Sequence, residues 1–370
     1  MQILMLGGTG AMGRNIAEIL LSGEHAVYIT SRSEQQSCGN INYLKCNAKN
    51  WNEIQPILAS RHWDIIVDFM VYGTSVFKSR VDSLLAACDQ YFFFSSSRVY
   101  AKSDTPITEQ SPRLLDTCRD LKYLKTDEYA LAKAREEVIL RSGQRQNFTI
   151  IRPYITYDIN RLQLGVYEKE VWLWRALQGK TIVFDATLMK CSTTMTSGYD
   201  VALRITAIMG KKEALGETFH IATSESRSWG EILQIYLNVI EEITGHRPKV
   251  ILTSILKKRV YGNYYQIIYD RNYDRVFDNS KINSITGLQD YTSPEEGLKN
   301  CLKEFLHQPK FLDIPWPLQG TMDKVAKEKT SYNSIPREHR REYRLARYLP
   351  TWLLLLYWKC RGAARRLCRR

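Results

Sequence analysis

Ile3-Leu4-Met5-Leu6-Gly7-Gly8-Thr9-Gly10-Ala11-Met12-Gly13 stands almost at the start of the chain. Its four apolar residues are typical of a buried parallel strand, and apolar residues recur at helical spacing from Met12 to Leu20. Gly7 and Gly10 let backbone amides approach a pyrophosphate at the helix N-terminus, and Gly13 lets the helix pack closely on the strand. The stretch therefore predicts a strand, a glycine turn and a helix that together bind a dinucleotide.

Further short apolar runs follow at intervals that suit a doubly wound parallel sheet. They are residues 26–30, 41–44, 64–69 and 91–94. With 370 residues, of which 44% are hydrophobic and 25% charged, the chain can bury a large core. We predict an α/β fold in which the sheet carries a smaller C-terminal substrate lobe and a basic amphipathic tail.

The second predicted strand ends in Thr30-Ser31-Arg32. A dinucleotide with a free 2′-hydroxyl usually meets an Asp or Glu at this place. An arginine without a carboxylate suits a 2′-phosphate instead, so the sequence favours NADP over NAD. The alternative is that Arg32 is a solvated turn residue.

Tyr129 and Lys133 are four residues apart in Tyr-Ala-Leu-Ala-Lys. On a helix this spacing puts phenol and ammonium on one face, where the cation can lower the pKa of the tyrosine toward the range of an acid/base catalyst. Ser95-Ser96-Ser97 follows the aromatic run 91–94 directly, so these hydroxyls should face the ligand crevice beyond the strand ends. They are also common turn formers.

These motifs occur in the order seen in extended short-chain dehydrogenases/reductases, and the chain resembles the NAD-dependent epimerase/dehydratase family over roughly its first 310 residues. The resemblance is carried by Gly7-x-x-Gly10-x-x-Gly13, Phe94-Ser95-Ser96-Ser97-Arg98-Val99-Tyr100, Pro106-Ile107-Thr108-Glu109, Tyr129-x-x-x-Lys133, Ile151-Arg152-Pro153-Tyr154-Ile155-Thr156-Tyr157, Tyr199-Asp200-Val201-Ala202, Gly216-Glu217-Thr218-Phe219-His220-Ile221-Ala222 and Phe277-Asp278-Asn279-Ser280-Lys281. It implies a Rossmann-type, NAD(P)-binding fold.

The resemblance also implies roles for single residues. Tyr129 would exchange a proton with a substrate hydroxyl while hydride moves to or from the nicotinamide, and Lys133 would bind the nicotinamide ribose. Ser96 would orient the substrate oxygen, with Ser95 and Ser97 as neighbouring alternatives. The cofactor-binding residues expected from the turn, the second strand and the family pattern are Gly7, Thr9, Gly10, Ala11, Met12, Gly13, Ser31, Arg32, Asn47 and Lys133.

The chain departs from the family pattern at three places. Family dehydratases place an Asp-Glu pair directly after the catalytic Thr, whereas this chain has Ser97 and Arg98 there, so dehydration is disfavoured and epimerisation or simple redox is favoured. Asn47 replaces the Asp that reaches the adenine, although its amide can still accept a hydrogen bond. Asp68-Phe69-Met70-Val71 after the fourth strand indicates an atypical branch.

We expect three parts in the chain. Residues 1–155 form the Rossmann core, residues 156–313 form the substrate lobe interleaved with the last core strand at about 217–222, and residues 314–370 form the basic tail. Residues 321–370 hold 14 Lys or Arg against 4 Asp or Glu, while the whole chain has a net charge of +13. The basic character therefore belongs to the tail.

The tail contains a short apolar segment, residues 349–358, between cationic flanks. Because a spanning helix needs roughly 20 apolar residues, the segment should not cross a bilayer. Its Trp and Tyr residues suggest a helix that lies on an anionic membrane surface. A helix packed on the domain or on a partner, and a disordered basic end, are the alternatives.

The first strand begins without a signal peptide ahead of it, so we expect a cytoplasmic protein. If the tail lies on a membrane, we expect the protein to attach to the inner face of that membrane. The eight cysteines show no metal-ligand spacing and should be reduced, and we expect no metal. In the substrate lobe, Trp172, Trp174, Arg175 and Lys180 are of the kinds that cover a sugar and a diphosphate, but such residues more often pack or face solvent.

We therefore expect an NAD(P)-dependent epimerase or reductase that acts on a hydroxyl or keto carbon, above all of a nucleotide-sugar, with Tyr129 as the acid/base. One alternative is a reductase of a lipid-like alcohol at a membrane surface. Another is an atypical RNA-binding member of the superfamily, which the intact Ser, Tyr and Lys set disfavours. A homodimer is left open.

Overall fold

The computed structural model describes residues 1–254, 264–354 and 356–358. The chain forms two compact units, each assembled from separate segments. Unit 1 comprises Met1–Asn160, Thr193–Ser226 and Asp274–Gly297. Unit 2 comprises Arg161–Ser192, Arg227–Tyr273 and Leu298–Arg370. The chain passes between the units more than once, so neither is a single continuous stretch of sequence.

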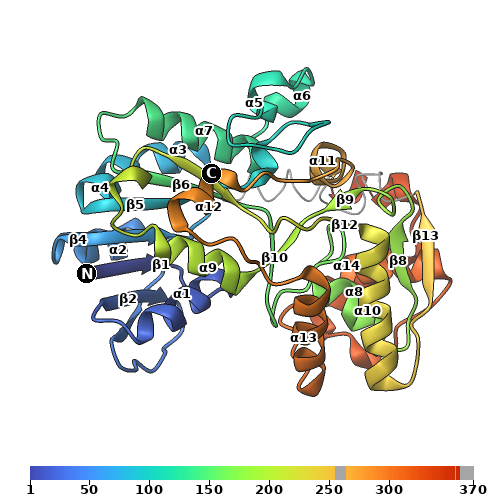
Figure 1. Ribbon diagram of the computed structural model, residues 1–370. Coiled ribbons are helices and arrows are strands. Elements are labelled where there is room, and N and C mark those ends of the chain that lie inside the picture. The colour runs from blue at the N-terminus through green and yellow to red at the C-terminus, as the bar shows by residue number, and fades with distance from the viewer. Residues whose placement is uncertain (255–263, 355, 359–370) are drawn as a thin grey trace. The chain divides into compact units, whose positions relative to one another are not determined.

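Unit 1 is built around a seven-stranded sheet in the order β11-β6-β5-β4-β1-β2-β3 (Figure 1). Each neighbouring pair is parallel. The strands are β1 (Gln2–Leu6), β2 (Ala26–Ser31), β3 (Ile41–Lys45), β4 (Trp63–Asp68), β5 (Cys88–Phe94), β6 (Phe148–Pro153) and β11 (Thr218–Ile221). The five predicted strands are present within one to three residues of the expected bounds, and the doubly wound α/β fold is confirmed.

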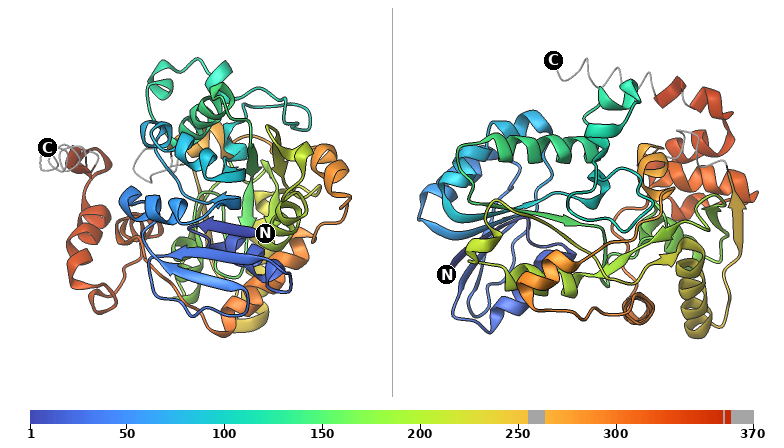
Figure 2. Two further views of the ribbon diagram at one scale, coloured as in Figure 1. Left: turned by 90° about the vertical axis from the view of Figure 1, so that its left-hand side faces the viewer. Right: turned by 45° about the horizontal axis from the view of Figure 1, so that its top comes forward.

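Helices cover both faces of this sheet, as the views in Figures 1 and 2 show. One hydrophobic core lies under α1 (Ala11–Leu21), α9 (Gly198–Ala207) and α12 (Ser280–Thr286). A second core lies under α2 (Trp51–Ala59), α4 (Val81–Ala86) and α7 (Tyr129–Ser142). Since the strands are covered on both sides, they read as continuous apolar runs in the sequence.

The strand order reverses beside β1, because β1 pairs with β4 on one side and with β2 on the other. In open parallel sheets ligands bind beyond the carboxyl ends of the strands at such a switch point. The glycine turn follows β1, Phe69 and Met70 follow β4, and the three serines follow β5. The fold thus brings the segments singled out in the sequence to one edge of the sheet.

The remaining elements of unit 1 are short. They are α3 (Thr74–Lys78), the 3-10 turns η1 (Ser97–Val99) and η2 (Lys212–Ala214), α5 (Leu114–Thr117), α6 (Leu121–Leu124), and the parallel pair β7 (Ile155–Tyr157) and β10 (Met195–Ser197). The two-residue strand β9 (Ser192–Thr193) lies at the boundary of the segment that begins at residue 193.

Unit 2 combines helices with the parallel pair β8 (Ile182–Asp185) and β13 (Val250–Thr253). Its long helix α10 (Trp229–Thr244) starts at a capping box made by Ser228 and Glu231 and ends at Gly245 with a φ of 73°. The other elements are α8 (Lys169–Leu177), β12 (Arg227–Ser228), α11 (Tyr264–Gln266), the π-helix η5 (Ile267–Arg271), α13 (Pro294–His307) from residue 298 on, α14 (Trp316–Ala326), η6 (Tyr332–Ser334), η7 (Arg337–His339) and α15 (Arg340–Tyr348).

Helical backbone continues beyond α15 at residues 351–354 and 356–358. Residues 359–370, which contain the last cations of the predicted basic tail, lie outside the described residues. Among the helices that the structure describes, none is both long enough and apolar enough to cross a membrane.

Candidate active site

In the glycine turn after β1, two positions have no room for a side chain. Gly7 has a φ of 72°, and a Cβ atom there would come within 2.6 Å of the Met70 Sδ atom. A Cβ atom on Gly13 would come within 2.3 Å of the Gly8 carbonyl oxygen, so this position needs glycine for the helix to approach the turn. A Cβ atom on Gly10 would meet nothing within 4 Å, which leaves open space on that side of the turn.

The N-terminus of α1 is suited to an anion. Gly10 is the N-cap residue and makes no side-chain capping hydrogen bond, and the first turn, Ala11 to Arg14, contains no acidic residue. The first amide groups of a helix have no intrahelical acceptor and lie at the positive end of the helix dipole. The open side of Gly10 and these amide donors fit the pyrophosphate of a dinucleotide.

A cavity of about 310 Å³ adjoins the turn. It is lined by Gly7, Thr9, Thr30, Ser31, Arg32, Cys46, Asn47, Ala48, Lys49, Phe69, Met70 and Val71. Five of the ten predicted cofactor-binding residues are among them: Gly7, Thr9, Ser31, Arg32 and Asn47. None of the described residues that line the cavity is acidic, whereas Arg32 and Lys49 are cationic. The cavity therefore offers two positive side chains and the Ser31 hydroxyl to the ribose end of a nucleotide.

The three serines after β5 have different partners. The Ser95 hydroxyl donates to Glu137 at 2.5 Å, and the Ser97 hydroxyl donates to the Arg152 carbonyl oxygen at 2.8 Å. The Ser96 oxygen accepts a hydrogen bond from the Arg98 amide at 3.2 Å. Of these three serines, Ser96 alone has no acceptor for its hydroxyl hydrogen among the described residues. Of the three alternatives left open by the sequence, Ser96 is the one whose hydroxyl can still donate to a substrate oxygen.

Tyr129 is the first residue of α7, and Glu128 is the N-cap residue of that helix. The Arg98 guanidinium lies 5.3 Å from the centroid of the Tyr129 ring and forms an ion pair with Glu128 at 2.6 Å. The Tyr123 hydroxyl also donates to Glu128, at 3.0 Å. A cation near the face of the ring is attracted by the ring quadrupole, so Arg98 helps to hold the Tyr129 ring in place.

Lys133 lies one turn after Tyr129 and is 1% exposed. Its ammonium donates to Glu136 at 2.9 Å and lies 4.5 Å from the centroid of the Phe93 ring. Asp68, at the end of β4, is also buried and accepts hydrogen bonds from Tyr91 at 2.8 Å, Tyr72 at 3.1 Å and the Met70 amide at 2.9 Å.

This group of side chains contains two acids and one cation. Burial raises the pKa of Glu136 to about 7, although the Lys133 ammonium acts in the opposite direction. Burial also raises the pKa of Asp68, against its three hydrogen-bond donors and the charge of Lys133. Glu136 Oε1 has no hydrogen-bond partner among the described residues. Lys133 thus lies in a buried cluster in which its one positive charge faces two acidic side chains.

Glu137, the next residue on α7, has the opposite environment. Burial alone would raise its pKa, but Arg152, Ser95 and Arg113 together hold the pKa below its usual range. The Arg152 guanidinium contacts both Glu137 oxygens, at 2.8 and 2.6 Å. Such a two-point pair fixes α7 to β6. It thereby positions the helix that carries Tyr129 and Lys133.

Sequence reasoning missed four residues of this region: Lys49, Arg98, Glu128 and Glu136. Lys49 stands two residues after Asn47, a spacing that places it at the same strand end. In the sequence, Arg98 was considered only because it stands where family dehydratases have the Glu of their Asp-Glu pair. Glu128 immediately precedes Tyr129 and was not considered. Glu136 is three residues after Lys133, which is close enough on a helix for an ion pair and was the signal that could have identified it.

The four substrate-lobe candidates are part of the interior of unit 2. Trp172 stacks on Tyr236 with ring centroids 4.5 Å apart, and Trp174 meets Trp316 edge to face at 5.3 Å. Arg175 is fully buried, and Lys180 forms an ion pair with Asp323 at 3.0 Å. Packing, the alternative left open by the sequence, therefore describes all four.

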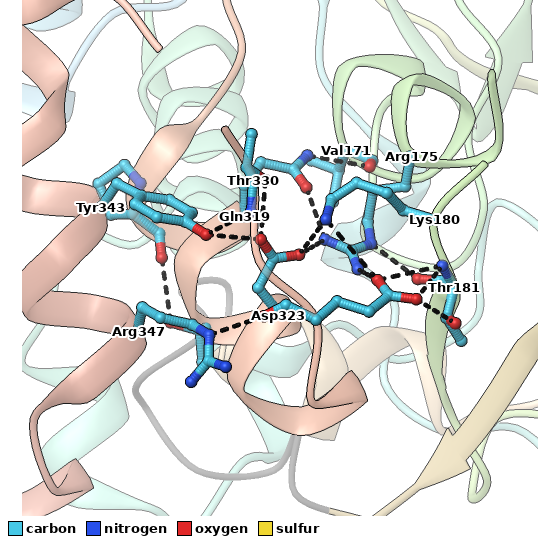
Figure 3. Close-up of polar contacts among 12 residues, drawn as sticks. Val171, Arg175, Lys180, Thr181, Gln319, Asp323, Thr330, Tyr343 and Arg347 are labelled. Atoms are coloured by element: carbon cyan, nitrogen blue, oxygen red, sulfur yellow. Dashed lines mark hydrogen bonds and ion pairs between the residues drawn. The ribbon is translucent and has the colours of Figure 1, made fainter. Parts of the chain in front are cut away.

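Arg175 and Asp323 are the centre of a buried polar network (Figure 3). Arg175 donates to Asp323 at 2.8 Å, to Gln319 at 3.0 Å and to Glu328 at 2.8 Å. The second oxygen of Asp323 accepts hydrogen bonds from Tyr343 and Thr330, both at 2.7 Å. Burial alone would raise the pKa of Asp323, but these donors hold the pKa below its usual range. The network joins α8 to α14 and α15.

In the part of the chain that the structure describes, no group of three His, Cys, Asp or Glu side chains could hold a metal ion. The described cysteines form no disulfide with one another.

Comparison with known proteins finds a family match for the first part of the chain. Residues 3–157 match the sequence model of the NAD dependent epimerase/dehydratase family. This range contains the glycine turn, the serines, Tyr129 and Lys133. No curated protein sequence matches the chain.

Solved structures share the fold at low sequence identity. UDP-glucuronic acid 4-epimerase from Bacillus cereus, in complex with UDP-glucuronic acid and NAD, is 17% identical with a TM-score of 0.62 over 84% of this chain and 100% of that one. dTDP-glucose 4,6-dehydratase from Bacillus anthracis, in complex with NAD, is 16% identical with a TM-score of 0.63 over 83% and 97%. An epimerase from Methanothermobacter thermautotrophicus is 14% identical with a TM-score of 0.65 over 83% and 92%.

The expected resemblance is therefore confirmed over residues 3–157 by the family model, and the solved structures show the shared fold. The family model covers the sequence from β1 to β7, and the solved structures cover more than four fifths of the chain. Over residues 3–157 the chain is therefore similar to the NAD dependent epimerase/dehydratase family, and its fold is similar to that of the solved structures named above.

Proposed function

We propose that this protein is an NAD(P)-dependent epimerase or reductase that acts on a hydroxyl or keto carbon of a nucleotide-sugar. The observation that carries the proposal is the arrangement around α7. Tyr129 and Lys133 lie one turn apart on this helix, and η1, which begins next to Ser96, packs against it. A protein that only binds a ligand has no need of this set. The nucleotide-sugar is supported by the B. cereus epimerase, which was solved with one.

The residues have separate tasks in the proposed reaction. The Tyr129 hydroxyl exchanges a proton with the substrate hydroxyl, and the Ser96 hydroxyl donates a hydrogen bond to the same substrate oxygen. Arg98 and Glu128 hold the Tyr129 ring. Lys133 would bind the nicotinamide ribose, and Gly10 with the first amides of α1 would hold the pyrophosphate. The nicotinamide, when bound, supplies the acceptor or donor of the hydride.

Epimerisation or simple redox fits the site better than dehydration. Removal of water needs an additional acid and base beside the reacting carbon. At the two positions after Ser96, the Ser97 hydroxyl is used by the Arg152 carbonyl oxygen and the Arg98 guanidinium is paired with Glu128. Neither position supplies a carboxyl group.

For the cofactor, we propose NADP rather than NAD. The support is the cavity beside β2, where Arg32, Lys49 and the Ser31 hydroxyl occur without an acidic residue among the described lining. The B. cereus epimerase and the B. anthracis dehydratase named above were solved with NAD, so this preference rests on the residues of this chain alone.

Replacement of Tyr129 tests the catalytic assignment. We expect Tyr129→Phe to lower turnover of nucleotide-sugars by about 10²- to 10⁴-fold, the range of a lost acid/base catalyst, while the affinity for NADPH stays the same. Tyr199→Phe is the matched control, since Tyr199 is 48% exposed on α9 of the same unit and should not affect turnover. Full turnover by Tyr129→Phe would falsify the assignment.

The cofactor proposal is tested separately, by binding alone. Any nucleotide released on denaturation is identified first, and NADPH and NADH are then titrated by fluorescence. We expect Arg32→Gln to weaken NADPH binding by roughly 10- to 100-fold with NADH unaffected, because one charge-assisted contact to the 2′-phosphate is lost. Lys45→Gln, another exposed cation at the end of β3, is the control. Tightly retained NAD in the purified protein would reject the preference for NADP.

A further inference from the structure

The C-terminal segment is an ordered part of unit 2 as far as α15. Tyr343 on α15 donates to Asp323 on α14, and the Arg347 guanidinium donates to the Glu328 carbonyl oxygen at 2.8 Å. A Cβ atom on Gly320 would come within 2.5 Å of the Tyr343 carbonyl oxygen, so the two helices are in close contact. Figure 3 shows Tyr343 and Arg347 beside Asp323. The predicted tail, residues 314–370, therefore contains two helices, α14 and α15, that pack on each other.

The packed helix has one buried and one exposed side. Tyr343 and Ala346 are buried against α14, whereas Arg341, Arg344 and Tyr348 are exposed. Positions three and four apart lie on the same side of a helix, so the exposed residues at 341, 344 and 348 form one row. Tyr348 is 55% exposed at the end of this row.

The helical residues that follow expose a second apolar pair. Leu354 is buried, but Trp352 is 66% exposed and Leu356 is 53% exposed. Trp352 belongs to the helical residues 351–354 and Leu356 to the helical residues 356–358. We define the exposed side chains Tyr348, Trp352 and Leu356 as the tail face, in which the extended residue Leu349 and Pro350 separate Tyr348 from the other two. Large apolar side chains exposed together, with charged residues nearby, mark a contact surface.

Charge and residue type indicate what this surface contacts. Residues 337–347 contain five arginines and two glutamates, and the sequence of residues 359–370, outside the described part, adds six cations. Tyr and Trp are enriched where a protein meets the headgroup region of a bilayer, and arginines beside them attract anionic lipids. We propose that the tail face lies on an anionic lipid surface and that the packing of α15 on α14 holds it there without a spanning helix.

Vesicle binding by the full chain tests this proposal. The protein is sedimented with phosphatidylcholine vesicles and with vesicles that contain one third phosphatidylglycerol, at low and at high salt. We expect binding to the anionic vesicles only, and release as salt screens the arginines. Arg341→Gln and Arg344→Gln should each weaken binding by about fivefold, the effect of one cation near an anionic surface.

The apolar side is tested by Trp352→Ser combined with Leu356→Ser, which should weaken vesicle binding by at least about tenfold because both side chains lose their burial in lipid. The matched control is Leu312→Ser, a leucine of the same unit that is 82% exposed and lies outside the tail face. Equal binding by the double variant and the wild type would overturn the proposal. Binding of single-stranded RNA without binding of vesicles would overturn it too.

Discussion

Unit 1 and unit 2 each bury a cluster of acids, and the two clusters differ in how many positive groups accompany them. In unit 1, Asp68 and Glu136 share one cation among the residues that the structure describes, Lys133. In unit 2, Asp323 and Glu328 meet both Arg175 and Lys180, and Asp323 also has two hydroxyl donors. Burial is similar at Asp68 and Asp323, yet the pKa is raised at the first and lowered at the second.

Asp68 and Asp323 each accept two hydroxyl hydrogen bonds, so the difference in pKa goes with the cations beside each acid and not with burial alone. The unit 2 cluster is compensated and joins the C-terminal helices to α8, as a structural network does. In the unit 1 cluster the two acids outnumber the cation Lys133, which follows Tyr129 by one turn of α7. Groups with raised pKa values are frequent at functional sites, which agrees with the proposed position of the active site.

Removal of the central acid of unit 2 should have the largest effect. We expect Asp323→Asn to lower the free energy of unfolding of unit 2 by about 3–5 kcal/mol, because the buried Arg175 and Lys180 charges then keep only the partly exposed Glu328 as an anion. Urea unfolding followed by tryptophan fluorescence reports on this unit, since six of the eight tryptophans belong to it.

The control for Asp323→Asn is Asp313→Asn, because Asp313 is exposed in the same unit. An exposed substitution of this kind should change stability by less than about 0.5 kcal/mol. The pH dependence follows from the lowered pKa of Asp323: its stabilisation is present above the unfolded value of 3.8 and is lost as the pH falls through the lower, folded value. If Asp323→Asn lowered the free energy of unfolding by less than about 1 kcal/mol at neutral pH, Asp323 would not be the anion that stabilises the buried Arg175 and Lys180.

In unit 1 the corresponding substitution should act in the opposite direction. Burial raises the pKa of Glu136 from 4.5 to about 7, so its ionisation opposes folding increasingly between these pH values and fully above pH 7. We expect Glu136→Gln to match the wild type near pH 4 and to be more stable by up to roughly 3 kcal/mol at pH 8. Urea unfolding by far-ultraviolet circular dichroism at pH 4, 6 and 8 measures the trend.

Glu137→Gln is the contrasting variant for this experiment. It changes the neighbouring residue on the same helix, but the buried Arg152 would then lose its carboxylate partner, and Arg113 would keep only Asp116. We expect this variant to be less stable than the wild type at pH 8. A gain from Glu136→Gln that did not depend on pH would mean that the raised pKa is not its cause.

Loss of a single hydroxyl from the unit 2 cluster should cost less. Tyr343→Phe removes the 2.7 Å hydrogen bond to an ionised Asp323, and we expect a loss of about 1.5–3 kcal/mol, the usual value for a hydrogen bond to a charged group. The urea midpoint at pH 7 measures it. Tyr332→Phe, a change in a partly exposed ring on η6, should leave the midpoint in place.

The matching hydroxyl in unit 1 should matter least. Tyr91→Phe removes the 2.8 Å hydrogen bond to Asp68, but burial already raises the pKa of this acid, which can take up a proton in response. We expect a loss of about 0.5–1.5 kcal/mol that shrinks toward acid pH, again measured by urea unfolding. A larger effect for Tyr91→Phe than for Tyr343→Phe would reverse the comparison between the clusters.

Local patterns in the sequence were sufficient for the framework of unit 1. The apolar runs predicted five strands of the sheet, and the spacing of Gly7, Gly10 and Gly13 predicted the turn. These features depend on neighbours a few residues apart, so a single sequence contains them. The family pattern likewise selected Tyr129, Lys133 and Ser96, whose catalytic roles stay a prediction.

The charged interior could not be predicted in this way. Arg175 pairs with Asp323 across 148 positions, and Arg152 with Glu137 across a strand and a helix, so no short pattern contains either pair. The same holds for the choice among Ser95, Ser96 and Ser97, which depends on what lies behind each hydroxyl after folding.

The sequence by itself determined the parallel sheet, the glycine turn and the helical spacing of Tyr129 and Lys133, because strand and helix periods are local. Only the tertiary structure decided the fates of Glu136 and Glu137. Consecutive residues of a helix point about 100° apart, so these two neighbours face different parts of the sheet. Glu136 meets Lys133 near Asp68, and Glu137 meets Arg152 on β6. Their opposite pKa shifts follow from that difference in direction.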